Sequence, residues 1–249
     1  MTIHGGIGNW LIFPKPVARA KHRLFCFPFA GGGASAFDGW ADLVPGAVEV
    51  VLVQPPGRES RLLEPSHHNL VELVRELVGH MPPLDIPFSF YGHSMGAFIA
   101  FELCRQLRRE TDVAPTKLFV SASRAPQVPD PEPPIHVLPD AEFLKRLVAR
   151  YDAIPPEVLS SAELMALLLP KLKADLELVE TYSVVADETR IPIPIYAYAG
   201  GDDAYVDTDQ VARWSELTTA SFDLEVMRGG HFFLSSQRAA LLASISSKL

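Results

Sequence analysis

The 249-residue chain has little cysteine and no excess of positive charge. Its two cysteines, Cys26 and Cys104, each lie within an apolar run, with no C-x-x-C motif or Cys/His cluster nearby. This pattern favours two buried, reduced thiols in the cytoplasm over disulfide bonds or a metal site. The formal net charge of -8 gives no electrostatic support for binding nucleic acid or an anionic membrane.

Long apolar stretches are also missing. No run of about 18 apolar residues occurs, so the sequence predicts no transmembrane helix. The opening segment, MTIHGGIGNWLIFPKP, lacks the basic stretch followed by an apolar one that marks a secretion signal. We therefore expect a cytoplasmic protein. Nothing in the sequence specifies an oligomer, so we also expect a monomer.

What the chain does contain is a regular alternation of two patterns. Runs rich in Val, Ile, Phe and Tyr predict strands buried on both faces of a sheet, and runs with helical spacing lie between them. The expected strands are 23–29, 48–54, 88–92, 117–123, 193–200 and 223–229, and the clearest helices are 69–81, 96–110 and 237–249. The alternation predicts an α/β fold over residues 1–249, as one domain with a mostly parallel sheet and helices on both faces.

One region interrupts this alternation. Residues 126–188, approximately, open with a proline-rich stretch and continue with helical patterns and no strand. Pro139 followed by Asp140 predicts a helix start. A long helical insertion between two strands is typical of a lid, and we expect a lid here. Its helix-periodic leucines are expected to pack the insertion onto the body rather than to contact substrate: Leu144, Leu147, Leu164 and Leu168.

The segment FSFYGHSMGAFIAFELC, residues 88–104, places a serine where a strand is expected to become a helix. Gly92 and Gly96 flank Ser94 in the pattern G-x-S-x-G. In a nucleophile elbow the sharp turn strains the serine backbone, and side chains at the two glycine positions would collide with the strand and the helix. The pattern in this context predicts that Ser94 is a nucleophile. His93, inside the elbow, is expected to be a packing residue.

A serine nucleophile needs a histidine base and an acid, which in this type of site follow the serine in the order acid, then histidine. Of the eight histidines only His231 follows the last expected strand, in MRGGHFFL. The segment YAYAGGDDAYVDTDQ offers the acid. We choose Asp203, because the apolar residues after it can fix its loop, and Asp202 remains the alternative. Asp207 and Asp209 are expected to cap the next helix.

A tetrahedral intermediate also needs two N–H donors for its oxyanion. One should be the N–H of Met95, after the nucleophile, and the other should come from a loop after an early strand. FCFPFAGGGASAFDGW supplies that loop, in which Ala30 is our candidate and Phe29 is less favoured. The same glycines fit a dinucleotide fingerprint, but the next strand ends in Val53 and Gln54, without the acidic residue that holds a ribose. We therefore disfavour nucleotide binding.

Four blocks occur in order along nearly the whole chain: FPFAGGGASAF, QPPGRESR, YGHSMGAFIAFEL, and GGDDAYV with GGHFFL. Together they closely resemble the type II thioesterases, stand-alone α/β-hydrolases that accompany polyketide synthases and nonribosomal peptide synthetases. The resemblance implies that the enzyme hydrolyses acyl thioesters on the phosphopantetheine arm of an acyl- or peptidyl-carrier protein and so removes aberrant or decarboxylated acyl units. It implies Ser94, His231 and Asp203 as the catalytic triad, Ala30 and Met95 as the oxyanion hole, and no metal or cofactor.

The residues predicted to contact the substrate or the carrier are Phe29, Gly31, Arg58 and Phe232. Two interpretations of Arg58, Glu59 and Arg61 stay open: they line the entrance for the pantetheine arm or the carrier, or they form a buried ion-pair network that fixes the loop after the second strand. Three other functions also stay open. These are a chain-terminating thioesterase for medium-length acyl groups, a general serine esterase, and a non-catalytic binder, which is disfavoured because serine, acid and histidine are all present in order.

Overall fold

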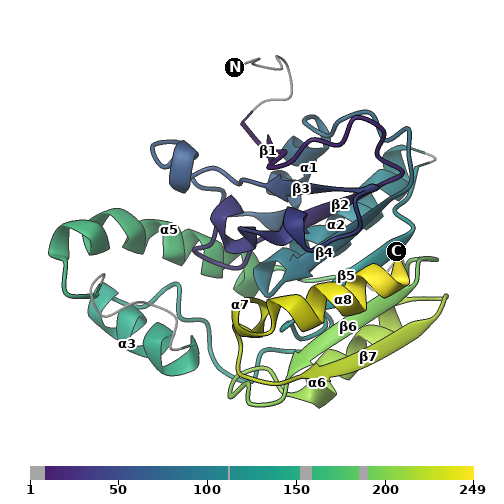
Figure 1. Cartoon of the computed structure of the whole chain (residues 1–249). Coiled ribbons are helices and arrows are strands. Elements are labelled where there is room, and N and C mark those ends of the chain that lie inside the picture. Colours follow the sequence, from purple (N-terminus) through teal and green to yellow (C-terminus); the bar gives the residue numbers. More distant parts are fainter. Residues whose placement is uncertain (1–8, 112, 152–158, 185–189) are drawn as a thin grey trace.

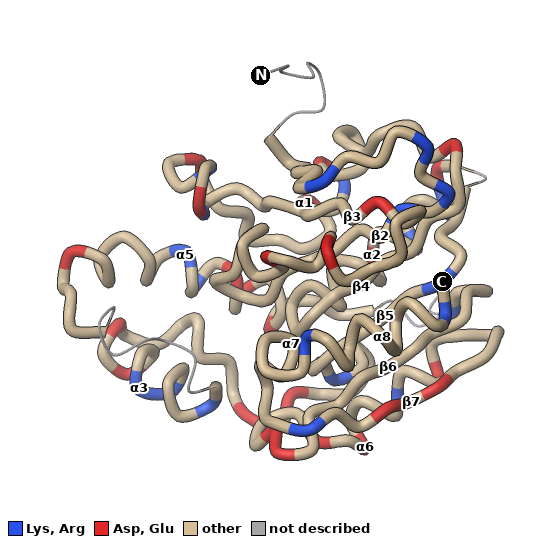
Figure 2. The backbone as a smooth tube through the Cα atoms, viewed as in Figure 1, with Lys and Arg blue, Asp and Glu red and all other residues tan. Residues whose placement is uncertain are grey.

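The computed structural model describes residues 9–111, 113–151, 159–184 and 190–249 (Figure 1). Its centre is a seven-stranded sheet in the order β1-β3-β2-β4-β5-β6-β7. The strands are β1 (Leu11–Ile12), β2 (His22–Phe27), β3 (Val48–Val53), β4 (Phe88–His93), β5 (Lys117–Ser121), β6 (Ile195–Gly200) and β7 (Phe222–Met227). β1 pairs antiparallel with β3, and every other neighbouring pair is parallel. At one free edge of the sheet, β7 carries acidic residues (Figure 2).

Helices cover both faces of the sheet. The α-helices are α1 (Leu70–Val78), α2 (Met95–Glu110), α3 (Asp140–Tyr151), α5 (Ala162–Thr181), α6 (Thr208–Ala212), α7 (Phe233–Ser236) and α8 (Arg238–Lys248). The short 3-10 helices are η1 (Ala34–Phe37), η2 (Trp40–Asp42), η3 (Glu59–Arg61) and η5 (Arg213–Leu217). Alternate residues of each buried strand point to opposite faces, so the sheet separates two apolar cores. One core includes α1, α2 and α6, and the other includes η1, η2, α7 and α8.

The two cysteines illustrate this separation. Cys26 on β2 belongs to one core and Cys104 on α2 to the other, and both are buried and free. The sheet lies between them, so they cannot pair. Burial raises the pKa of each thiol, which keeps both protonated.

The insertion between β5 and β6 contributes α3 and α5, which lie beside each other to the left of the sheet in Figure 1. These helices share a small core of their own, formed by Ile135, Phe143, Leu147 and Leu176. Further along, α5 packs against α2 of the main body. The expected lid, 126–188, includes residues 152–158 and 185–188, which lie outside the described residues.

Most of the predicted architecture is confirmed. Each expected strand agrees with a real one to within two residues at either end. The helix expected over 69–81 ends earlier, at Val78, and is followed by Gly79. β1 and α7 were not predicted, because elements of two and four residues are too short to show a periodic pattern.

The two expected caps of α6 differ from each other. Asp207 is the N-cap, and its carboxylate accepts from the N–H of Gln210 in a capping box. Asp209 lies within the first turn instead. Among the described residues, no helix is long and apolar enough to cross a membrane.

Candidate active site

The sharp turn at Ser94 joins β4 directly to α2. Ser94 has φ 54° and ψ -117°, a strained conformation for a residue with a side chain. A Cβ on Gly92 would lie 2.2 Å from the carbonyl oxygen of Gly96, and one on Gly96 would lie 2.1 Å from the carbonyl oxygen of Phe27. Both contacts are with backbone, which cannot rotate away. The two glycines are therefore required by close packing of β4, α2 and the end of β2.

Parallel strands end at the same edge of the sheet, and this brings the predicted residues together. Ser94 follows β4, Asp203 follows β6 and His231 follows β7. The Oγ of Ser94 lies 3.0 Å from Nε2 of His231, and Nδ1 of His231 lies 2.7 Å from Oδ2 of Asp203. Since a carboxylate only accepts, Nδ1 carries the proton, and Nε2 is free to accept the hydroxyl proton of Ser94.

Asp203 is the acid that the fold presents to the histidine, not the neighbouring Asp202, which is exposed. Its second oxygen, Oδ1, accepts from the N–H groups of Tyr205 and Val206, each at 3.0 Å. Burial alone would raise the pKa of Asp203, but the hydrogen bond and charge of His231, together with the two N–H donors, lower the pKa overall. The carboxylate is thus held ionised and in one orientation.

His93 has a more specific environment than its expected role of packing residue. Its Nε2 lies 2.9 Å from the carbonyl oxygen of His231, so Nε2 donates. Its Nδ1 lies 3.0 Å from Oγ of Ser121, which donates in turn. Burial, followed by the proximity of His231, lowers the pKa of His93 to about 3. A neutral ring therefore links the serine turn to the backbone of the histidine loop.

The two expected oxyanion donors, Ala30 and Met95, line the same cavity as Ser94 and His231. The N–H of Met95 is at the first turn of α2, where backbone N–H groups have no partner within the helix. The N–H of Ala30 has no acceptor among the described residues. Both groups are therefore available to a ligand beside Ser94.

The loop that carries Ala30 is held by side chains from other segments. The N–H of Gly31 donates to Oδ2 of Asp175 at 2.7 Å, and the N–H of Ala34 donates to Oε1 of Gln54 at 2.7 Å. Arg58 donates to the carbonyl of Gly32 at 3.0 Å and forms an ion pair with Asp175. Of the two open interpretations of Arg58, the geometry favours the buried ion-pair network.

The cavity has a volume of about 220 Å³. Its walls come from both the main body and the insertion. The lining residues include Phe29, Gly31, Arg58, Leu147, Met165, Leu168, Leu172, Val179 and Phe232. All four residues predicted to contact substrate or carrier therefore border it, although the charged groups of Arg58 are engaged with Asp175.

The leucines of the insertion do not behave as one group. Leu147 packs in the core of the insertion and also borders the cavity, and Leu168 borders the cavity as well. Leu164 is exposed. The expectation that these leucines pack the insertion onto the body was therefore wrong for Leu164. Sequence periodicity identifies a helix face but not what covers that face.

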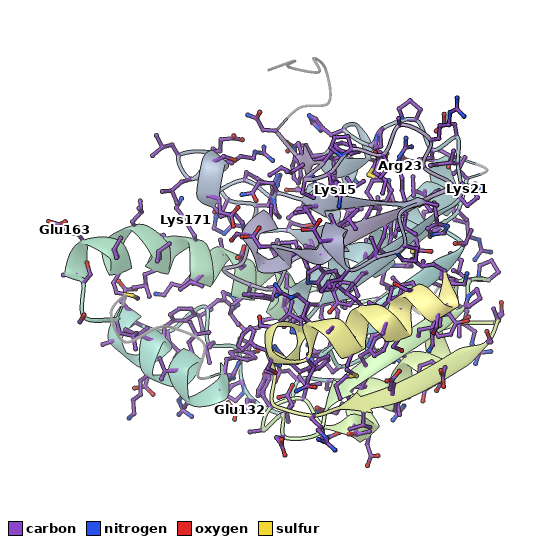
Figure 3. The ribbon with its side chains drawn as sticks, in the orientation of Figure 1. Lys15, Lys21, Arg23, Glu132, Glu163 and Lys171 are labelled. Carbon is purple, nitrogen blue, oxygen red and sulfur yellow. The ribbon has the colours of Figure 1, made fainter. Side chains whose placement is uncertain are left out.

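Two residues that the sequence did not single out also reach the site, both from the insertion. The ring of Tyr151, at the end of α3, lies 4.8 Å from the ring of His231. Asp175, in the middle of α5, contacts the glycine loop. No sequence signal distinguishes Asp175, because the same helix also carries Lys171 (Figure 3), Lys173 and Glu177. Within the described part of the chain, no group of three or more His, Cys, Asp or Glu side chains could hold a metal ion.

The mostly parallel sheet, the strained serine turn and the chain order of serine, acid and histidine define an α/β-hydrolase. Residues 22–249 match the Thioesterase domain family, and the chain belongs to that family. It is a hydrolase that acts on thioesters.

Individual relatives agree with this assignment. The chain is 39% identical over 250 residues to the gramicidin S biosynthesis protein GrsT of Aneurinibacillus migulanus, covering 100% of this chain and 97% of GrsT. The structure of BorB, a type II thioesterase from the borrelidin biosynthetic cluster, matches with a TM-score of 0.81 and 30% identity, over 98% of this chain and 97% of BorB. The medium-chain S-acyl fatty acid synthase thioesterase of Rattus norvegicus is 30% identical over 224 residues, 86% of this chain and 82% of the rat enzyme. The resemblance to type II thioesterases is confirmed.

Proposed function

We propose that this thioesterase cleaves acyl groups from the phosphopantetheine arm of an acyl- or peptidyl-carrier protein and thereby clears aberrant or decarboxylated units from a biosynthetic assembly line. The observation that carries the proposal is the chain of hydrogen bonds from Ser94 through His231 to Asp203, at one wall of a cavity bordered largely by apolar side chains. Full-length similarity to the gramicidin S biosynthesis protein GrsT and to the type II thioesterase BorB supports a role in such a biosynthetic pathway.

The first half of the reaction forms an acyl-enzyme. Oγ of Ser94 attacks the thioester carbon while Nε2 of His231 takes its proton. The carbonyl oxygen becomes an oxyanion, which the N–H groups of Ala30 and Met95 stabilise. The C–S bond then breaks, and His231 returns the proton to the departing pantetheine sulfur.

The second half releases the acid. A water molecule gives a proton to Nε2 of His231 and attacks the acyl carbon, a second oxyanion forms in the same place, and Ser94 leaves as it regains its proton. Asp203 stays ionised throughout. It holds Nδ1–H of His231 and stabilises the imidazolium that forms in each half.

Within this scheme the insertion acts as a lid over the cavity, in one domain with the main body. The cavity walls contributed by α3 and α5 support this assignment. A second candidate function is the release of medium-length acyl chains, which the similarity to the rat enzyme favours. The two functions differ in the acyl length that the cavity accepts.

The test is intact-mass spectrometry of carrier proteins loaded with acetyl, propionyl, octanoyl or dodecanoyl groups. Each is incubated with the native enzyme or with Ser94→Ala, which we expect to lower turnover by at least ~10³-fold because no other nucleophile replaces Oγ. Loss of the short acyl groups with native enzyme alone would support the editing role. Loss confined to the two long chains would support chain release, and equal loss with both proteins would refute the serine mechanism.

A further inference from the structure

Asp175 connects the insertion to the loop that carries Ala30. It lies on α5, is only 1% exposed, and uses both carboxylate oxygens. Oδ1 accepts from Nη2 of Arg58 at 2.7 Å, and Oδ2 accepts from Nη1 of Arg58 at 2.9 Å and from the N–H of Gly31 at 2.7 Å. Its position is thus fixed by three hydrogen bonds to two different loops of the main body.

The contact reaches the proposed oxyanion donor through one tight turn. The N–H of Gly32 donates to the carbonyl of Phe29 at 2.9 Å, which closes a turn over residues 29–32. Gly31 has φ 80° at the third position, as a type II turn requires. The peptide unit that contains the Phe29 carbonyl also contains the N–H of Ala30, so this turn determines where the donor points.

The central peptide unit of the turn and the unit that follows the turn are held by Asp175 and by its ion-pair partner Arg58. Asp175 accepts from the N–H of Gly31, and Arg58, paired with Asp175, donates to the carbonyl of Gly32. Rotation of the central peptide to the alternative turn type would reverse the N–H of Gly31 and break the bond to Asp175. Leu172, one turn before Asp175 on α5, lies so close that a Cβ on Gly31 would be 2.6 Å from it. The same face of α5 therefore both supports the turn and restricts its volume.

We propose that Asp175 is a positioning residue: together with Arg58 it holds in place the turn whose first peptide unit presents the N–H of Ala30 to the oxyanion, so the oxyanion hole is complete only when α5 is packed against the main body. The inference rests on the proposed function, because it takes Ala30 as an oxyanion donor. It makes α5 part of the catalytic geometry and more than a wall of the cavity.

The pair is buried, so removing one partner would leave the other charged and unpaired. The main variant is therefore the double substitution Arg58→Met with Asp175→Leu, which removes both charges and keeps similar volume. We expect kcat to fall about 10- to 100-fold, which is no more than the fall in kcat when an oxyanion-hole donor is removed altogether. KM should change less than about threefold. Asp175→Asn keeps an oxygen for Gly31 N–H and is expected to lose less kcat than the double variant.

Two inhibitors separate positioning from a general loss of structure. The first is a trifluoromethyl ketone analogue of an acyl-pantetheine. Oγ of Ser94 adds to its carbonyl carbon, and the carbonyl oxygen becomes an oxyanion. In the double variant the affinity for this inhibitor should weaken by about the same factor as kcat. The corresponding thioether forms no oxyanion, and its affinity should stay constant. Glu177→Ala is the matched control, because it removes the contact of Glu177 with Nδ1 of His68, another link from α5 to the main body, at 2.6 Å. This control should retain native kcat.

The proposal is overturned if the double variant keeps native kcat, or if its affinities for the ketone and the thioether fall by the same factor. If circular dichroism shows that the double variant does not fold, Asp175→Asn serves as the test instead. Its affinity for the ketone should also weaken, by a smaller factor, while its affinity for the thioether stays constant. Failure here is distinct from failure of the proposed function. An inactive Ser94→Ala with an unaffected double variant would refute only the role of Asp175, whereas an active Ser94→Ala would refute the serine mechanism itself.

Discussion

Two segments supply the proposed oxyanion donors, and they are held in place by different means. The Met95 segment is held by steric contact between backbones, where Gly92 and Gly96 allow a strand and a helix to touch. The Ala30 segment is held by side chains that reach it from elsewhere in the chain, Asp175 from 144 residues away. The Met95 segment is thus fixed by direct backbone packing, whereas the position of the Ala30 segment depends on side chains of other elements.

The difference predicts different responses to substitution. A backbone contact has no alternative arrangement, so a single added carbon should disrupt the serine turn as a whole. A hydrogen-bonded loop can retain part of its geometry when one contact is removed. Three experiments, ordered from the largest expected effect to the smallest, test this contrast.

Gly96→Ala should have the largest effect. The new Cβ would lie 2.1 Å from the carbonyl oxygen of Phe27, and the backbone must move to admit it. We expect the free energy of unfolding to fall by about 3 kcal/mol and kcat/KM to fall by about 100-fold or more, measured by urea unfolding and by thioester hydrolysis. Gly46→Ala is the control, because a Cβ there meets nothing within 4 Å. Near-native activity of Gly96→Ala would contradict the steric account of the turn.

Gln54→Leu should have an intermediate effect on the other segment. Gln54 is completely buried, accepts from the N–H of Ala34 and donates to the carbonyl of Arg58 at 2.9 Å. Leucine would leave the N–H of Ala34 unpaired and would remove one of the two donors to the carbonyl of Arg58, which keeps the N–H of Arg61. We therefore expect stability to fall by about 2 kcal/mol and kcat by roughly tenfold. Glu59→Gln is a milder comparison, because it retains an oxygen for Ser35. A loss in Gln54→Leu as large as in Gly96→Ala would remove the distinction between the two segments.

His93→Gln should have the smallest effect at neutral pH, because we expect it to change the stability only as the pH falls. The pKa of His93 is lowered in the fold to about 3 from an ordinary value of 6.5. Between these two pH values His93 is therefore protonated in the unfolded chain and neutral in the folded protein. This contribution to stability is complete above pH 6.5 and is lost as pH falls from there toward 3. Between pH 7 and pH 5 the native enzyme should lose about 2 kcal/mol more than the variant in urea unfolding. Parallel losses in the two proteins would show that His93 titrates normally in the fold.

The same contrast explains what could be predicted from the sequence. Ser94 and its glycines are readable because a steric requirement within five residues restricts the residue types directly. His231 and Asp203 follow from their order after late strands, although the choice between Asp202 and Asp203 needed the actual loop geometry. Asp175 could not be predicted, because its partners are set by how α5 packs, and no local pattern encodes that.

His93 occupies an intermediate position. Its place within the serine turn was evident, but its partner is the carbonyl of His231, 138 residues away. In a sequence pattern, a side chain that bridges distant segments cannot be told from an ordinary packing residue, because its partner is not a neighbour in the chain. Arg58 was left between two interpretations for the same reason, and its pairing with Asp175 favours the ion-pair network.

The two free edges of the sheet have a consequence for how copies of the chain meet. β1 is only two residues long, and β7 carries Asp223 and Glu225. If two β7 strands paired antiparallel, their carboxylates would face each other across the new ladder, which is unfavourable. We therefore expect neither edge to be a good template for a second sheet, so edge-to-edge association of copies should be weak.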